Sequence, residues 1–189
     1  MCGRYQAWIE EDELLRIIER EKKGSASQYF LKDEVFPGDE IPIIYGSCVA
    51  VRAHKAIWGF PKPKEMSESG LIINARAETA IQKPMFRQLI ENGRAIVLMS
   101  GYYEWSSGVK YRYYDESGAI LMAALERVVD DERRFVVLTT SAYGTPSKQH
   151  DRMPVFVSKS EMKDWLYNES YAKNILTRHI PCNLKYEVC

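Results

Sequence analysis

The chain has 189 residues, of which 46% are hydrophobic and 28% are charged. This composition supplies a core and excludes an intrinsically disordered chain. Lys and Arg number 26, as do Asp and Glu, so the net charge of zero excludes a protein that coats nucleic acid by bulk positive charge. Any contact with DNA must therefore come from a local cluster of basic residues.

No targeting or membrane segment is evident along the chain. The longest unbroken apolar run, residues 119–125, is far shorter than the ~20 residues that span a bilayer. The acidic stretch at 10–13 is incompatible with a signal peptide. We therefore expect a cytoplasmic protein that does not enter the membrane and consists of one domain, residues 1–189.

The cysteine pattern predicts free thiols. The four cysteines form no C-x-x-C pair, and no histidine lies at zinc-ligand spacing from any of them; they are Cys2, Cys48, Cys182 and Cys189. In the absence of a secretory signal we expect them to be reduced. We expect neither a metal site nor a cofactor.

Three helices are predicted, with strands between them. The first is an amphipathic helix at 12–23, ended by Gly24, and the second, 84–91, begins with Pro84. The third is at 161–166, where Ser158 and Glu161 have the spacing of a capping box. Strands are predicted where β-branched and aromatic runs are bounded by turn residues, at 49–56, 71–73, 95–99, 111–114, 119–125, 135–139 and 155–157.

The order of these elements predicts the fold class. Helices do not alternate regularly with strands, which indicates an α+β fold with a curved, mostly antiparallel sheet and a few peripheral helices. The dipeptide Ser117-Gly118 lies between two of the strand runs and predicts a hairpin that joins them.

Polar residues occur in four segments where a plain core would not need them: 1–4, 74–79, 101–105 and 150–154. Cys2 is the most specific feature, because removal of Met1 would leave an amine and a thiol two carbons apart. Such a 1,2-aminothiol condenses with an aldehyde, first as a Schiff base and then as a thiazolidine ring. The alternative is a cysteine that merely follows the start residue in a frayed terminus.

Two further residues are candidates for proton transfer. Glu104 lies between tyrosines and Trp105, and burial among aromatic rings would raise the pKa of its carboxyl toward neutrality. The alternative for Glu104 is a salt bridge to a nearby arginine. His150 lies just before a predicted strand and suits proton transfer, although a solvated loop histidine is the commoner case.

Candidate ligands for DNA are less specific. In an extended backbone Asn74 and Arg76 project to the same side, although the segment could equally end a strand and cap the next helix. Three arginines, Arg4, Arg76 and Arg152, would form a phosphate clamp if they converge, but arginine is also a common surface residue. Trp58 could stack on a base, or it could belong to the core.

These segments, in this order, resemble the SOS-response-associated peptidase (SRAP) family, the abasic-site processing proteins. The resemblance extends from residue 1 to about residue 166 and includes Trp58-Gly59 and Phe86-Arg87 besides the four segments. It implies a β-rich α+β domain that binds single-stranded DNA and links Cys2 covalently to the ring-opened sugar of an abasic site. The family's name reflects a proposed autopeptidase activity that exposes the cysteine.

The resemblance also implies roles for individual residues. Asn74 would position the cysteine or the sugar, Glu104 would shuttle protons, and His150 would assist the Schiff-base chemistry. The phosphate ligands implied by the resemblance are Arg4, Arg76 and Arg152. We expect the protein to act as a monomer on single-stranded DNA, associating with the nucleoid when it is bound there.

Two other classes of function remain open from the sequence. One is a thiol peptidase that uses Cys2 and His150 on peptides in trans and needs no DNA. The other is a non-catalytic single-strand binding module, in which Cys2 would be dispensable. The balanced charge argues against this second class, because such modules carry an extended basic groove.

Overall fold

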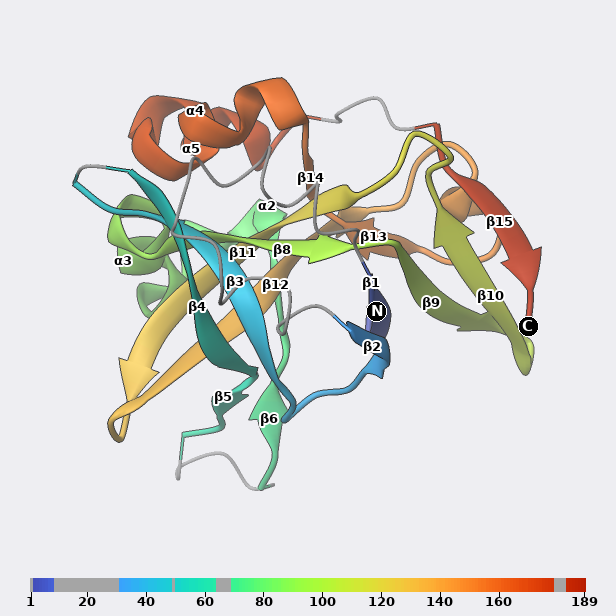
Figure 1. Ribbon diagram of the computed structural model, residues 1–189, viewed down its shortest axis with the longest axis horizontal. Helices are drawn as coiled ribbons and strands as arrows, with labels where there is room; N and C mark the ends of the chain where they lie inside the picture. Colours follow the sequence, from blue (N-terminus) through green and yellow to red (C-terminus); the bar gives the residue numbers. More distant parts are fainter. Residues whose placement is uncertain (1, 9–30, 49, 64–68, 179–182) are drawn as a thin grey trace.

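The computed structural model describes residues 2–8, 31–48, 50–63, 69–178 and 183–189. The helix predicted at 12–23 lies outside the described residues. Two sheets face each other in Figure 1, and helices cover the side of the larger sheet that lies away from the smaller one. The fold is therefore layered, with the small sheet, the large sheet and the helices in succession.

Within the described residues the smaller sheet has five strands, all of them antiparallel to their neighbours. In spatial order they are β15 (Lys185–Val188), β10 (Val109–Tyr114), β9 (Gly101–Ser106), β1 (Arg4–Trp8) and β2 (Leu31–Val35). The chain terminus that carries the candidate nucleophile thus enters this sheet as a central strand.

In the part of the chain that the structure describes, the larger sheet has eight strands, of which five close into a ring through the pairing of β12 with both β11 and β4. The ring consists of β12 (Glu132–Ser141), β4 (Val51–Trp58), β3 (Glu40–Gly46), β8 (Arg94–Met99) and β11 (Ile120–Val129). Three short strands extend it: β7 (Asn74–Arg76), β13 (Arg152–Pro154) and β14 (Phe156–Val157). Among the described strands of this sheet, only the pairings of β12 with β4 and β7 are parallel. A separate two-stranded antiparallel ribbon consists of β5 (Phe60–Pro61) and β6 (Leu71–Ile72).

Both faces of the large sheet are buried, which explains its continuous apolar runs. Ile96 and Leu98 of β8 pack in a cluster with the helices, whereas Val97 and Met99 pack in a second cluster with the small sheet. Because successive side chains of a strand point to opposite faces, a strand covered on both sides is apolar throughout. The strands predicted at 95–99, 119–125 and 135–139 are confirmed, with β11 and β12 extending beyond the predicted runs.

Helices form one cover of the large sheet. They are α2 (Ala77–Ala80), α3 (Pro84–Asn92), α4 (Met162–Tyr167) and α5 (Glu169–Ile175), with the 3-10 turn η3 (Lys159–Glu161) leading into α4. A second 3-10 turn, η2 (Pro146–Lys148), lies apart from this cover and contacts β13. The prediction of α3 from Pro84 is confirmed. The helix predicted at 161–166 is present one residue later, but Ser158 bonds the Glu161 carboxylate (2.5 Å) rather than a backbone amide, so the capping box is not formed.

The hairpin predicted at Ser117-Gly118 is wrong. The strands on either side, β10 and β11, belong to different sheets and do not pair. A turn is present, with Gly118 N–H donating to Asp115 O (3.3 Å), but it carries the chain from one sheet to the other. Hairpins occur instead at Ser107-Gly108 and Asp130-Asp131, where both central residues have the positive φ that two-residue hairpin turns favour.

Candidate active site

Cys2 lies between the two sheets, immediately before β1. The register of β1 against β9 pairs Arg4 with Tyr103, so the chain that leads into β1 runs beside the part of β9 that carries Glu104. Cys2 has no exposed surface and belongs to the buried cluster between the sheets. The sheet topology therefore brings the first and third predicted segments together.

Asn74 holds the backbone of Cys2. Its Nδ2 donates a hydrogen bond to the carbonyl oxygen of Cys2 (2.8 Å), which joins β7 to the N-terminal segment. Its Oδ1 is buried and has no hydrogen-bond partner among the residues that the structure describes. Buried acceptors are usually satisfied in folded proteins, so an unsatisfied one points to a partner that is not part of the described chain. The Oδ1 atom of Asn74 is therefore available to accept a hydrogen bond from a ligand beside Cys2.

Glu104 is a buried carboxylate facing a histidine. Its residue surface is only 4% exposed, and burial raises the pKa of its carboxyl, while the nearby charge of His150 acts in the opposite direction. Oε2 of Glu104 lies 3.6 Å from Nε2 of His150. This arrangement suits a group that takes up and returns a proton.

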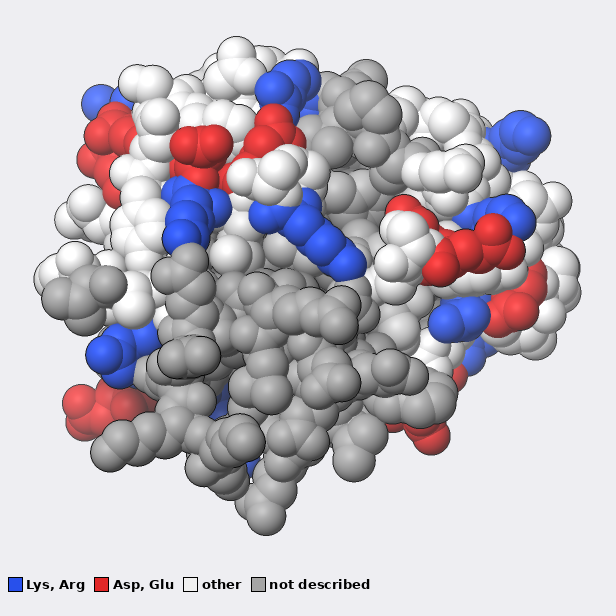
Figure 2. Space-filling view, turned by 45° about the horizontal axis from the view of Figure 1, so that its top comes forward, with Lys and Arg blue, Asp and Glu red and all other residues white. Residues whose placement is uncertain are grey.

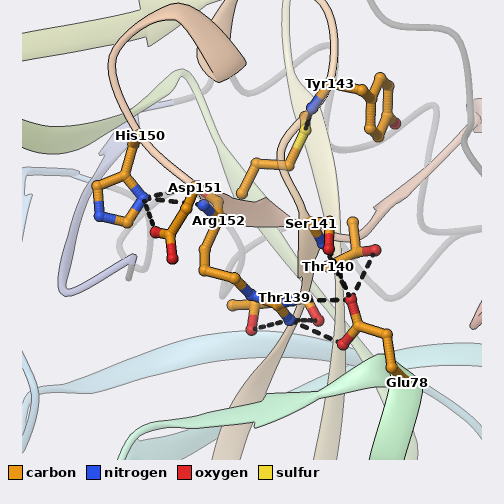
Figure 3. A network of polar contacts seen from close by, with 9 residues as sticks. Glu78, Thr139, Thr140, Ser141, Tyr143, His150, Asp151 and Arg152 are labelled. Atoms are coloured by element: carbon orange, nitrogen blue, oxygen red, sulfur yellow. Dashed lines mark hydrogen bonds and ion pairs between the residues drawn. The ribbon is translucent and has the colours of Figure 1, made fainter.

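The loop between η2 and β13 presents His150 to Glu104. In Figure 3 the imidazole lies beside Asp151 and the backbone of Arg152. Nδ1 of His150 lies 3.0 Å from the Arg152 N–H, 3.1 Å from the Arg152 carbonyl oxygen and 3.2 Å from Oδ1 of Asp151. One ring nitrogen thus faces the buried carboxylate and the other faces the outer side of the loop.

The thiol of Cys2 is held in its neutral form. Burial raises the pKa of the Cys2 thiol well above its ordinary value, and the charge of Glu104 raises it further. A thiol in this environment is a poor first nucleophile, because the thiolate is the reactive species.

Arg4 lies on the outer face of the small sheet among aromatic rings. Its guanidinium carbon is 4.3 Å from the ring centre of Phe36 and 4.9 Å from that of Trp105, and both rings are about 40% exposed. Its Nη1 also pairs with Oε2 of Glu34 (3.0 Å), whose other oxygen contacts Lys110. Arg4 therefore combines positive charge with two exposed stacking surfaces.

Arg76 and Arg152 differ in their exposure to solvent. Arg76 is exposed at the end of β7, where it precedes α2 without capping it through a side chain. Arg152 is buried, and Figure 3 shows its guanidinium against Glu78 and Thr139. Its two terminal nitrogens bond the two Glu78 oxygens at 2.7 and 2.9 Å. The structure therefore leaves Arg76 exposed and Arg4 partly exposed, whereas the charge of Arg152 is paired internally with Glu78.

Trp58, which the sequence offered as either a base-stacking or a core residue, lies in the core of this structure. The side chain has no exposed surface, and its Nε1 donates to the carbonyl oxygen of Ile73 (3.0 Å). Tyr5 packs against one part of the ring at a centroid distance of 5.1 Å, and Phe135 stacks on it at 6.3 Å. An enclosed ring leaves no face for a nucleobase.

Comparison with known protein families identifies the chain. The family model described as SOS response associated peptidase (SRAP) matches residues 1–186. The chain belongs to the SRAP family. Its resemblance to that family, which the four polar segments indicated, is thereby confirmed.

Individual SRAP relatives carry names that refer to DNA lesions. The chain is 27% identical over 179 residues to the abasic site processing protein YoaM of Bacillus subtilis, covering 88% of this chain and 79% of the relative. It is 28% identical over 185 residues to the abasic site processing protein YedK of Escherichia coli, covering 92% and 82% of the two chains.

Solved structures show the same fold. A protein from Bordetella bronchiseptica superimposes with a TM-score of 0.80 at 20% identity, covering all of this chain and 99% of the other. A protein from Bacteroides thetaiotaomicron gives a TM-score of 0.77 at 21% identity, covering 99% and 91%. The β-rich α+β fold with mostly antiparallel strands is confirmed.

Several residues around this SRAP site were not predicted from the sequence. Trp105 was noted only as a neighbour of Glu104, although the alternation of side chains along a strand places the two on opposite faces. Glu34 and Lys110, which flank Arg4, gave no sequence signal because they come from separate strands. Gln149 gave no sequence signal either, because the residue that donates a hydrogen bond to its side chain, Tyr113 (3.1 Å), lies far from it in the chain.

The surface of this SRAP protein agrees with its balanced composition. Figure 2 shows a face on which Lys and Arg atoms are interspersed with Asp and Glu atoms. Within the described residues, no group of three His, Cys, Asp or Glu side chains is arranged to hold a metal ion. In that same part of the chain, no helix is long and apolar enough to cross a bilayer.

Proposed function

We propose that this protein captures abasic sites in single-stranded DNA as a covalent adduct of Cys2, formed after Met1 is removed. The observation that carries the proposal is the convergence on Cys2 of a buried amide acceptor, Asn74, and a buried carboxylate, Glu104, that faces His150. Membership of the SRAP family and the names of the relatives supply the substrate class.

The chemistry follows from a terminal 1,2-aminothiol. The α-amine attacks the aldehyde carbon of the ring-opened sugar, and loss of water leaves a C=N bond. The sulfur of Cys2 then adds to the imine carbon, the π electrons of the C=N bond return to nitrogen, and the thiol proton is transferred to that nitrogen. Ring closure gives a thiazolidine, which lacks the hydrolysable imine and is therefore the more durable adduct.

The buried thiol supports this order of steps. Because its raised pKa keeps it protonated, the amine is the better first nucleophile, and the thiol is needed only after the reactive imine has formed. The same observation disfavours the second candidate, a thiol peptidase acting on peptides in trans, which requires a thiolate to attack first. Removal of Met1 by autoproteolysis, the activity that the family's name suggests, is an extension of the proposal.

Three residues receive roles around the reacting carbon. Asn74 orients the terminus through the Cys2 carbonyl and offers its Oδ1 to the amine or to a sugar hydroxyl. Glu104 accepts a proton from the ammonium group and returns one to the departing hydroxyl. His150 assists the opening of the sugar ring from the solvent side of Glu104.

Contact with DNA is assigned to the exposed cations and rings near the site. Arg4 and Arg76 would bind phosphates, and Phe36 and Trp105 would stack on bases. Single-stranded DNA suits such a surface, because its bases are free to stack. We further propose that residues 1–189 act as one unit and as a monomer, associated with the nucleoid when bound to DNA.

One experiment tests the proposal directly. Untagged protein is incubated with a single-stranded oligonucleotide that carries one abasic site, and the mixture is analysed by denaturing electrophoresis. We expect a heat-stable shifted band, whose protein mass lacks Met1. The matched controls are an intact oligonucleotide and Cys2→Ala, which keeps a terminal amine but cannot close the ring. Absence of the band with the wild-type protein, or its persistence in Cys2→Ala without borohydride, would refute the proposal.

A further inference from the structure

The proposed reaction leaves one proton behind in a buried site. The ammonium and thiol groups of Cys2 bring four exchangeable hydrogens, three on nitrogen and one on sulfur. The thiazolidine nitrogen keeps one, and the departing water takes two along with the aldehyde oxygen. The fourth must leave as H⁺ for the adduct to form, and a proton must return before the adduct can reverse.

A graded path from buried to exposed groups begins at Glu104. The Glu104 side chain is 5% exposed, that of His150 is 20% exposed and that of Asp151 is 86% exposed. Glu104 faces Nε2 of His150 at 3.6 Å, and Asp151 faces Nδ1 of the same ring at 3.2 Å. The first distance is longer than a hydrogen bond, and it would need to shorten for transfer, as catalytic contacts often do when substrate binds.

The surroundings of His150 support both neutral tautomers. With the proton on Nε2, the lone pair of Nδ1 accepts the hydrogen bond of the Arg152 N–H at 3.0 Å. With the proton on Nδ1, that atom can donate to Asp151 Oδ1 at 3.2 Å or to the Arg152 carbonyl oxygen at 3.1 Å. A ring that exchanges between two supported tautomers can take a proton on one nitrogen and release another from the opposite nitrogen.

We propose that Glu104, His150 and Asp151 form a proton relay, in which Asp151 exchanges the surplus proton with solvent. The inference rests on the proposed function, because the surplus proton arises from thiazolidine formation. Asp151 acts through His150 and does not touch the reacting atoms. The positive charge nearest in sequence, Arg152, is turned toward Glu78 and therefore leaves the Asp151 carboxylate available to the histidine.

The test uses Asp151→Asn, which keeps the shape and the hydrogen-bonding oxygen but cannot carry a proton. The side chain is exposed, so the substitution should not alter folding. In dilute buffer we expect crosslinking to slow by about tenfold, less than the ~10²-fold of a positioned acid or base because water can replace Asp151 in part. Reversal should slow by the same factor, and the final yield of adduct should not change.

Chemical rescue separates a relay from a structural role. Added imidazole should restore the rate of Asp151→Asn while leaving the wild-type rate unchanged, because a small buffer can exchange protons directly with His150. The control is Asp130→Asn, which also removes one negative charge but at the exposed β11–β12 turn. Its crosslinking rate should equal that of the wild type.

The outcomes distinguish the two proposals. If the wild-type protein forms no adduct, the proposed function fails and the relay fails with it. If the wild type forms the adduct and Asp151→Asn matches its rate at every buffer concentration, the relay alone is wrong. A slow variant that imidazole does not rescue, or one that has lost affinity for intact single-stranded DNA, would also overturn the relay.

Discussion

The hydroxyl of Tyr113 donates a 3.1 Å hydrogen bond to Oε1 of Gln149, the residue that precedes His150. Tyr113 is fully buried on β10, and its ring stacks on that of Tyr102 at a centroid distance of 5.0 Å. The small sheet, which carries Glu104, therefore also holds the loop that carries His150. We therefore expect the separation between the carboxylate and the imidazole to depend on this contact.

Tyr113→Phe tests this positioning role. The variant keeps the buried ring and removes one hydrogen bond, so we expect a loss of about 1 kcal/mol in the free energy of unfolding. Crosslinking to abasic DNA should slow more than binding weakens, since His150 would lose its alignment with Glu104. Tyr111→Phe, on the same strand, is the control. Equal rates in the wild type and Tyr113→Phe would show that the hydrogen bond is only structural.

The ion pair between Glu78 and Arg152 predicts a pH dependence of stability. Burial alone would raise the pKa of Glu78, but the hydrogen bonds from Arg152 outweigh it and lower this pKa from 4.5 to about 2. A carboxylate whose pKa is lower in the folded state stabilises the fold fully above its unfolded pKa. Its contribution is then lost as the pH falls from about 4.5 to about 2.

Glu78→Gln should therefore lower the free energy of unfolding at pH 7 and converge with the wild type in acid. We expect about 1 kcal/mol at pH 7, because Glu78 is partly exposed and solvent weakens the pair. Urea unfolding at pH 7, 4 and 3 measures the difference. Glu116→Gln, which breaks an exposed pair with Lys185, is the control. A difference that stays constant with pH would contradict the linkage.

If DNA binds Arg4 as proposed, Glu34 should compete with it for this cation. Its carboxylate pairs with Arg4 at 3.0 Å and also contacts Lys110, so a phosphate must displace it from either cation. Glu34→Gln should raise the affinity for intact single-stranded DNA by roughly two- to fivefold, the range of an exposed ion pair. Fluorescence anisotropy at low salt measures this change, with Glu132→Gln as the control. An unchanged affinity would show that the DNA does not reach Arg4.

Sequence patterns identified the strands with apolar runs because these strands are covered on both faces. They did not identify which strands pair, since Ser117-Gly118 has the composition of a hairpin turn whether its flanking strands share a sheet or not. Pairing depends on contacts between residues far apart in the chain, which local propensity does not record.

The same limit applies to the site. Cys2, Glu104 and His150 could be named as site candidates from the sequence because each side chain has distinctive chemistry in its local context. The burial of Arg152 and Trp58 could not be predicted, because a guanidinium or an indole is compatible with either a surface or a core. The buried position of Arg152 depends on its ion pair with Glu78, and that of Trp58 on its hydrogen bond to Ile73. Both partners lie in other segments of the chain.

Salt dependence reports how many cations contact the DNA. With Arg76 exposed, Arg4 partly exposed and Arg152 paired internally, two proposed phosphate contacts would give a log–log slope of about −1.4, at roughly 0.7 per phosphate on a single strand. Arg76→Gln should reduce the slope by about 0.7. A wild-type slope near −2 would indicate that Arg152 leaves Glu78 to bind a third phosphate.

Glu104 and His150 are predicted to divide the proton transfers of the reaction. Glu104 must take a proton from the Cys2 ammonium before attack and give one to the departing hydroxyl, and its raised pKa suits both tasks. Glu104→Gln should slow crosslinking by ~10²-fold or more, and His150→Ala should slow the crosslinking or its reversal by a comparable factor. Neither variant should change the affinity for an intact single strand.

Stability gives an independent check on Glu104. Because burial raises its pKa in the folded state, its ionisation opposes folding increasingly as the pH rises through that pKa. Glu104→Gln removes this cost, so its free energy of unfolding at pH 8 should equal or exceed that of the wild type even though crosslinking is slowed. This outcome would show that Glu104 serves activity at the expense of stability. If Glu104→Gln instead unfolded more readily and crosslinked at the normal rate, Glu104 would be a structural residue, and the proton-transfer assignment would be wrong.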